Sequence, residues 1–167
     1  AYPVSTAIDL GFNDSTSILF FQKVNHSIHI IDSYENNNQA LPHYVQLIKD
    51  KPYFYDTHYA PHDLDQHDIA TGKTRRVVPR ILLEDGIHAV KMILPRCKID
   101  SDKCSKFLIA LRHYHRKYSD KDRTFKMKPN HDFSSHFCDA LRCLATGLEE
   151  NKIINNKALQ QKAESNY

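Results

Sequence analysis

The stretch VSTAIDLGFNDSTSILFFQKVNHSIHIID, residues 4–32, decides the fold. It holds three apolar runs that are short for helices, at residues 4–10, 17–23 and 27–32. Turn residues separate these runs, with Gly11 to Asp14 after the first and Asn25 after the second. Short strands joined by tight turns favour an antiparallel meander, so we expect three neighbouring strands at the start of the chain.

The remainder of the sequence alternates between helical and strand-like patterns. Helical spacing of apolar residues predicts helices over residues 40–49, 76–85, 101–118 and 134–148. Strands are expected over residues 53–60 and 90–94, and a polar loop over residues 119–130. A meander followed by strand–helix units predicts an α/β fold with a mixed sheet flanked by helices. We expect one domain over residues 1–150 and a polar C-terminal extension over residues 151–167.

Composition indicates a globular domain, because 41% of the 167 residues are hydrophobic and 26% are charged. The sequence has no apolar run long enough to span a bilayer, so no membrane partner is expected. The four cysteines match no zinc or redox spacing, which favours reduced thiols in a cytosolic protein. The net charge of +3 is too small to indicate nucleic-acid binding by itself.

Three carboxylates stand at structural transitions. Asp9 follows the first strand, Asp63 follows the fourth, and Asp139 lies in the last helix. If the first and fourth strands are neighbours, Asp9 and Asp63 lie side by side, and a helix packed across the sheet could add Asp139. Converging carboxylates repel one another and call for divalent cations such as Mg²⁺ or Mn²⁺. Taken singly, each of these residues could equally be a turn or cap residue.

Four segments carry a family resemblance that spans about residues 4–148, and the intervening IDSYE at residues 31–35 and LRHY at 111–114 also fit it. The four segments are AIDLGFNDST at residues 7–16, YAPHD at 59–63, TGKTRR at 71–76 and HDFSSHFCDALR at 131–142. Together they resemble the nuclease domain of phage terminase large subunits. The last segment places His136, Asp139 and Arg142 in the family's register, whereas Phe137, Cys138 and Cys143 depart from its usual residues.

The resemblance implies a ribonuclease H-like fold and a metal-dependent endonuclease that cleaves double-stranded DNA during viral genome packaging. It implies two divalent cations, Mg²⁺ or Mn²⁺, held by Asp9, Asp63 and Asp139, with His136 as a further catalytic residue. The implied partners are double-stranded DNA, an N-terminal ATPase domain of the same polypeptide, the portal and the small terminase subunit. The implied location is the cytoplasm of the host cell.

Several residues around the three carboxylates are further candidates. Asp14, Asp65 and Asp68 are candidates for auxiliary metal ligands, and Asp14 could equally cap its turn. Lys73, Arg75 and Arg76 are expected to contact DNA phosphates. A second basic run, at residues 121–128, could contact DNA or form a solvated loop.

Other cofactors are not expected. Gly72, Lys73 and Thr74 imitate the end of a nucleotide-binding loop, but His67 replaces the required first glycine, so no nucleotide is expected in this domain. A zinc site at His58 and His62 would need helical spacing, which Pro61 interrupts.

Two other functions remain open at this point. The same carboxylate chemistry would serve another ribonuclease H-like nuclease, such as a junction resolvase or a transposase core. Alternatively, the domain could retain the fold without catalysis and only grip DNA or dock to a portal.

Overall fold

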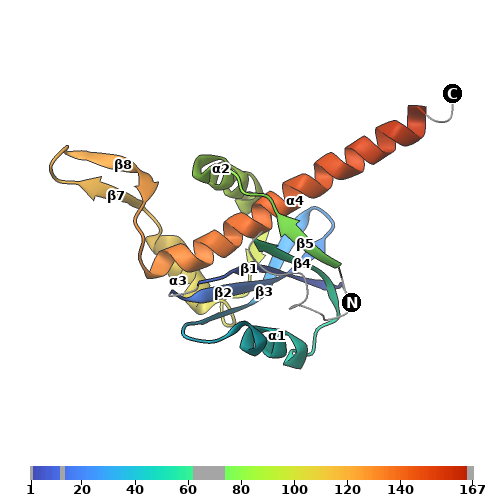
Figure 1. Ribbon diagram of the computed structural model, residues 1–167, viewed down its shortest axis with the longest axis horizontal. Helices are drawn as coiled ribbons and strands as arrows, with labels where there is room; N and C mark the ends of the chain where they lie inside the picture. Colours follow the sequence, from blue (N-terminus) through green and yellow to red (C-terminus); the bar gives the residue numbers. More distant parts are fainter. Residues whose placement is uncertain (1, 12–13, 62–73, 165–167) are drawn as a thin grey trace.

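The computed structural model describes residues 2–11, 14–61 and 74–164 (Figure 1); for Thr74, Arg75, Met127 and residues 150–164 it describes the backbone only. The strands are β1 (Val4–Asp9), β2 (Thr16–Val24), β3 (Ser27–Asn36), β4 (Tyr55–Pro61), β5 (Thr74–Val78), β6 (Cys97–Ile99), β7 (Arg116–Ser119) and β8 (Thr124–Pro129). The helices are α1 (Leu41–Asp50), α2 (Leu83–Ile93), the 3-10 turn η1 (Leu94–Arg96), α3 (Ser105–His113) and α4 (Phe133–Glu164).

Six strands form a mixed sheet in the order β5-β4-β1-β2-β3-β6. β2 runs antiparallel to both β1 and β3, which confirms the predicted three-strand meander. β4 lies parallel to β1, with Ala7 opposite Tyr59, so the first and fourth strands are neighbours as the site hypothesis requires. The carboxyl ends of β1 and β4 therefore meet at the same edge of the sheet.

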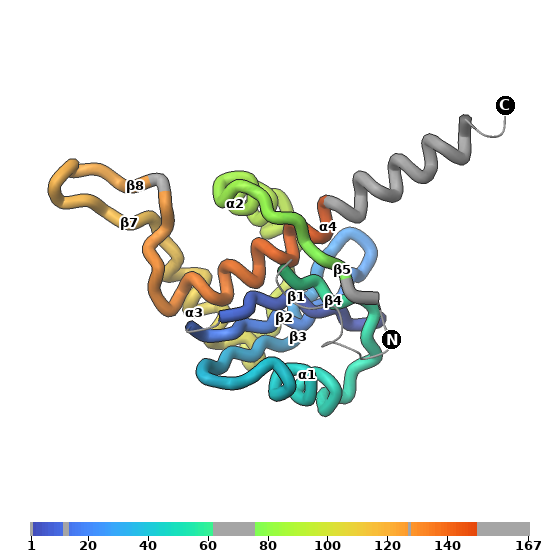
Figure 2. Tube along the Cα trace, in the orientation of Figure 1, coloured from blue at the N-terminus to red at the C-terminus, as the bar shows by residue number. Residues whose placement is uncertain are grey.

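Helices cover both faces of the sheet (Figure 1, Figure 2). α2, α3 and α4 pack on one face, and α1 packs on the other. β2 lies in the middle of the sheet and is buried on both sides: Leu19 and Phe21 face α4, whereas Ile18 and Phe20 face α1. Burial on both faces explains why its sequence is a continuous apolar run rather than an alternating one.

α4 lies unusually close to β4 at one point. A Cβ atom at Gly147 would lie 2.3 Å from Cδ1 of Tyr59, whose side chain is fully buried. Glycine at this position lets the helix backbone rest directly on the tyrosine ring. This contact limits how closely α4 packs against the sheet. It therefore also helps to determine the distance between side chains of α4 and the carboxyl ends of β1 and β4.

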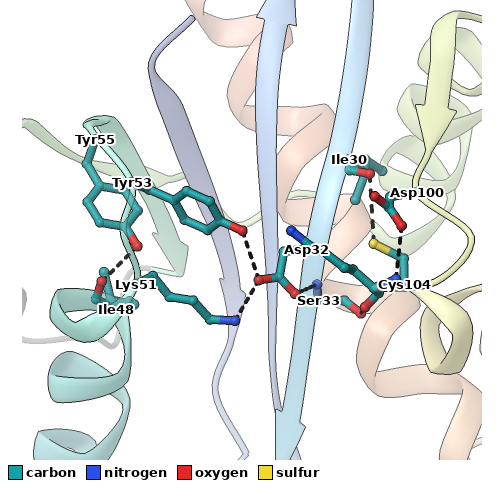
Figure 3. A network of polar contacts seen from close by, with 10 residues as sticks. Ile30, Asp32, Ser33, Ile48, Lys51, Tyr53, Tyr55, Asp100 and Cys104 are labelled. Carbon is teal, nitrogen blue, oxygen red and sulfur yellow. Dashed lines mark hydrogen bonds and ion pairs between the residues drawn. The ribbon is translucent and has the colours of Figure 1, made fainter. Parts of the chain in front are cut away.

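The α1 face holds a polar network around Asp32 of β3 (Figure 3). Its Oδ2 accepts hydrogen bonds from Lys51 Nζ at 2.6 Å and from the Tyr53 hydroxyl at 3.1 Å. Its Oδ1 accepts the backbone N–H of Ser33 at 2.8 Å. Nearby, the Tyr55 hydroxyl donates to the carbonyl oxygen of Ile48 at the end of α1. The network links α1 and the segment that follows it to β3.

Two expectations near the middle of the chain are wrong. The predicted helix over residues 76–85 is strand β5 followed by a later helix, and the predicted strand over residues 90–94 lies largely within α2. Pairing with β4 overrides the helical spacing, because Val77 and Val78 extend the parallel sheet. Gly86, the residue after the predicted helix, lies inside α2, and an added Cβ atom there would lie 3.3 Å from the Arg142 side chain.

The second half of the chain also differs from its predicted outline. α3 ends at His113, five residues before the predicted end, and the expected polar loop at residues 119–130 is largely a hairpin made of β7 and β8. The backbone of α4 continues to Glu164, beyond the predicted end at Leu148. Among the described residues, no helix is long and apolar enough to cross a membrane.

Candidate active site

A cavity of about 430 Å³ opens where the ends of β1 and β4 meet α2 and α4. Asp9 reaches it from the end of β1. Ala7 packs into the core beneath α4, and side chains alternate along a strand, so Asp9 falls on the same face. Pro61, the last residue of β4, lines the cavity beside it.

α4 supplies the opposite wall through one helix face. Asp139, Arg142, Cys143 and Thr146 line the cavity at helical spacings of three, four and seven residues. The start of this helix is fixed by Asp132, whose carboxylate accepts the backbone N–H and the hydroxyl of Ser134. These hydrogen bonds lower the pKa of Asp132, so the capping carboxylate stays ionised further into the acid range than an ordinary aspartate.

Asp139 forms an ion pair with Arg142. Both Nη2, at 2.6 Å, and Nε, at 3.1 Å, donate to the same oxygen, Oδ1. The Asp139 side chain is 28% exposed, so the carboxylate remains open to the cavity. The charge of Asp139 also affects Tyr114. Burial is the largest cause that raises the pKa of Tyr114 to about 12, and the negative charge of Asp139 is the second.

Asp9 and Cys143 line the same cavity, so the end of β1 faces this side of α4. Burial raises the pKa of the Cys143 thiol to about 12, and the charge of Asp9 adds to this increase. The backbone of Ile8 and the charge of Arg142 act in the opposite direction. Since Cys143 follows Asp139 by one helical turn, the end of β1 and the carboxylate of α4 face the same space.

The donor set of the cavity fits a hard divalent cation. Asp9 and Asp139 supply carboxylate oxygens, which are the ligands that Mg²⁺ and Mn²⁺ prefer. Within the described residues, no group of three His, Cys, Asp or Glu side chains forms a metal cluster. Asp63, the predicted third ligand, follows the cavity-lining Pro61 by two residues and lies outside the described residues, as do Asp65, Asp68 and Lys73.

His136 and Asp14 are not among the residues that line the cavity. His136 lies one turn before Asp139 on α4, and its ring is 5.8 Å from the ring of His131. Asp14 pairs instead with His131, at 3.3 Å between Oδ2 and Nε2. The catalytic role of His136 and the auxiliary metal role of Asp14 stay predictions.

The basic cluster after β4 is only partly described. The side chain of Arg75 is not described, whereas Arg76 is partly buried in β5 and its Nη1 has no hydrogen-bond partner within the described residues. His58, considered above as a zinc ligand, is buried in the sheet and hydrogen-bonded through Nδ1 to the Thr6 hydroxyl at 2.8 Å. Contact of Arg75 and Arg76 with DNA stays a prediction.

Sequence reasoning missed two polar side chains that line the cavity, those of Arg80 and Thr146. Thr146 could have been found, because it follows Asp139 by two helical turns. Arg80 could not, since it was placed inside a helix that does not exist. Arg142 was recognised as part of a motif, but its ion pair with Asp139 was not foreseen.

Comparison with known proteins gives a consistent result. No family model matches the chain. The terminase large subunit of Escherichia phage T5 is 25% identical over 156 residues, a match that covers 85% of this chain and 34% of the T5 protein. The chain thus spans about a third of the length of this curated relative.

Solved structures extend the likeness. The large terminase nuclease domain of bacteriophage SPP1 with bound Mn has a TM-score of 0.67 and 13% identity, covering 89% of this chain and 86% of that domain. The phage P22 large terminase nuclease domain has a TM-score of 0.63 and 17% identity, covering 87% and 80%. The resemblance predicted from the sequence is confirmed. The likeness also confirms the predicted ribonuclease H-like fold.

A longer structure shows the same match within a larger protein. The large terminase of a thermophilic bacteriophage in complex with ADP has a TM-score of 0.67 and 14% identity. The match covers 87% of this chain but 39% of the thermophilic phage protein. In both the thermophilic phage terminase and the T5 subunit, therefore, most of the polypeptide lies outside the region that resembles this chain.

Proposed function

We propose that this chain is the nuclease domain of a phage large terminase and hydrolyses phosphodiester bonds of double-stranded DNA during genome packaging. One observation carries the proposal: Asp9 and Asp139, far apart in the sequence, line one cavity at the edge where β1 and β4 end. The similarity to the T5 large subunit and to terminase nuclease domains supports the same conclusion.

In the proposed site, Asp9 and Asp139 would hold a divalent cation. Asp63 would supply the third carboxylate, so that the three residues together hold two cations. Such ions, Mg²⁺ or Mn²⁺, activate a water molecule and stabilise the leaving oxygen when bound. Bound Mn in the SPP1 domain supports this choice of metal. Asp65 and Asp68 are proposed as auxiliary ligands, with Asp14 as a more distant candidate.

The remaining candidate residues are proposed to contact the DNA phosphate or to donate a proton to the leaving oxygen. Arg142 offsets the charge of Asp139 and places a guanidinium in the cavity, where it can contact a phosphate oxygen. His136, one turn from Asp139, is proposed to donate a proton to the leaving oxygen. Lys73, Arg75 and Arg76 are proposed to contact the DNA backbone as it approaches.

The proposed partners follow from the part of the relatives that this chain does not match. An N-terminal ATPase domain of the same polypeptide would occupy the unmatched length, as the ADP complex of the thermophilic phage protein suggests. The portal and the small terminase subunit are the proposed assembly partners, in the host cytoplasm. No nucleotide is proposed to bind this domain.

A plasmid-nicking assay tests the proposal. The purified chain should convert supercoiled DNA to nicked and linear forms with Mn²⁺, and EDTA should abolish cutting. Asp9→Asn should be inactive, whereas Asp50→Asn, an exposed carboxylate at the end of α1, should cut normally. Cutting in excess chelator would contradict metal dependence, and a strong preference for four-way junctions would indicate a resolvase instead.

A further inference from the structure

The β7–β8 hairpin stands away from the rest of the molecule. Its two strands pair with each other, with Tyr118 opposite Phe125, and form a separate two-stranded sheet. Figure 1 and Figure 2 show the hairpin projecting past the start of α4. The Ser119 hydroxyl donates to Asp122 Oδ2 at 2.7 Å and secures the turn. Hydrogen bonds within the hairpin therefore define its shape.

The hairpin concentrates the positive charge of the chain. Residues 116–128 contain six Lys and Arg against two Asp, a net charge of +4, whereas the whole chain has a net charge of +3. The remaining residues, with 17 cations and 18 acids, carry a net charge of −1. All six cations are exposed: Arg116, Lys117, Lys121, Arg123, Lys126 and Lys128. A polyanion approaching this nearly neutral domain is therefore attracted chiefly to the hairpin.

Two aromatic side chains are exposed among these cations. Tyr118 is 47% exposed and Phe125 is 59% exposed, and their rings meet edge to face with centroids 5.2 Å apart. Lys117 and Lys126 are the sequence neighbours of the two aromatic residues, at the point where the register between the two strands shifts. Aromatic rings beside lysine and arginine form the kind of surface that binds nucleic acids, since cations contact phosphates and rings contact sugars and bases.

We propose that the β7–β8 hairpin is a DNA-binding element separate from the cavity. It binds the phosphates of duplex DNA through its cations and packs Tyr118 and Phe125 against the sugars and base edges. The choice of DNA as the polyanion rests on the function proposed above. The hairpin supplies most of the binding free energy of this domain, and the cavity supplies the chemistry.

The test is DNA binding measured by fluorescence anisotropy in EDTA, where no cutting occurs, over a range of salt concentrations. Changing Lys121, Lys126 and Lys128 together to Gln should lower the slope of log K against log salt by about 2–3. The matched control changes Lys49, Lys98 and Lys106 to Gln, which removes the same charge from exposed positions on α1, β6 and α3. The control should leave the slope nearly unchanged.

The aromatic pair predicts a different signature. Tyr118→Ser with Phe125→Ser should weaken binding about tenfold or more without changing the salt slope, because ring contacts release no counterions. Thermal unfolding should be almost unchanged in both hairpin variants, since the hairpin lies outside the two cores.

Three outcomes would overturn the inference. An unchanged slope in the hairpin triple variant would exclude phosphate contacts there. An equal loss in the control would show that net charge alone governs binding. Equal affinity of the wild-type chain for polyglutamate and duplex DNA would indicate an acidic protein partner. If the chain binds DNA through the hairpin but does not cut it, the proposed function alone is contradicted. If the chain cuts DNA but binds it equally well without the hairpin cations, only this inference is contradicted.

Discussion

The two faces of the sheet each carry a carboxylate paired with a cation at 2.6 Å. On the α1 face Asp32 pairs with Lys51, and on the α4 face Asp139 pairs with Arg142. By distance alone the two ion pairs are equivalent. Their surroundings differ in every respect that matters for chemistry, so the comparison separates a structural ion pair from a functional one.

Asp32 is closed off. Its side chain is 9% exposed, and both oxygens are used, by Ser33, Lys51 and Tyr53 (Figure 3). Burial, with the charge and hydrogen bond of Asp32, raises the pKa of Tyr53 to about 12, so the phenol remains a donor at any physiological pH. A carboxylate satisfied in this way has no room for a metal ion or a substrate.

Asp139 is held but not enclosed. Arg142 donates twice to one oxygen, and the carboxylate faces a cavity that it shares with Asp9. An ion pair is therefore no sign of function by itself. The open cavity and the second carboxylate distinguish this site, and the variants below test that distinction in order of expected effect.

Asp9→Asn and Asp139→Asn should each lower the rate of DNA cutting by about a thousandfold or more, because each removes an anionic metal ligand. Asp9→Asn should also leave the melting temperature unchanged or slightly raised, since it removes repulsion between carboxylates. The measurement is nicking per folded molecule with Mn²⁺, with folding checked by circular dichroism. Wild-type cutting by either variant would show that the cavity is not the active site.

Asp32→Ala should have the opposite profile. It leaves Lys51 and Tyr53 without their acceptor and should lower the free energy of unfolding by about 3 kcal/mol. Cutting per folded molecule should be unchanged. Urea unfolding measures the effect, with Asp50→Ala as an exposed control expected to change stability by less than about 0.5 kcal/mol. A stability loss no larger than the control's would mean that the network around Asp32 contributes little.

Acid should weaken the same face through His58. Burial lowers the pKa of His58 from 6.5 to about 4, so the unfolded chain takes up the proton first. The stability contributed by neutral His58 is complete above pH 6.5 and is lost as the pH falls to about 4, by about 3 kcal/mol. Unfolding curves at several pH values should show this loss, and His58→Gln should flatten the pH dependence in that window. An identical pH dependence in the variant would assign the loss to other groups.

Gly147→Ala should disturb the α4 face by a smaller amount. The added Cβ meets the buried Tyr59 ring at 2.3 Å, so α4 must shift, at a cost of about 1–3 kcal/mol. Cutting should fall as well, because the shift moves Asp139 relative to Asp9. Gly86→Ala is the matched control for stability: its Cβ would meet the flexible Arg142 side chain at 3.3 Å and should lower the free energy of unfolding by less. Equal effects of the two substitutions would argue against a special role for the close approach at Gly147.

Sequence reasoning succeeded where the signal was local. Short apolar runs with turn residues between them predicted the meander, and a helical apolar stripe predicted α4, so Asp9 and Asp139 could be placed at their elements. It failed where distant contacts decide the structure. β5 forms because it can pair with β4, which lies beside it in the sheet. The β7–β8 hairpin was predicted as a loop because its sequence is rich in lysine and has no apolar stripe.

The two ion pairs show the same limit at the level of a site. Nothing near Asp32 in the sequence reveals that Lys51 and Tyr53 close around it. The partner of Asp139, by contrast, is three residues away, at a spacing that a helix makes visible. The cavity between Asp9 and Asp139 depends on the strand order and on the packing of α4, which no local pattern specifies.

Binding of Mn²⁺, followed by electron paramagnetic resonance of the free ion, tests most directly whether Asp9 and Asp139 form one metal site. The wild-type chain and Asp50→Asn should bind Mn²⁺ equally, whereas Asp9→Asn and Asp139→Asn should each weaken binding at least about tenfold, since each removes a charged oxygen ligand. Unchanged Mn²⁺ binding in both cavity variants would contradict this metal site, because the ion would then be held somewhere other than between the carboxyl end of β1 and α4.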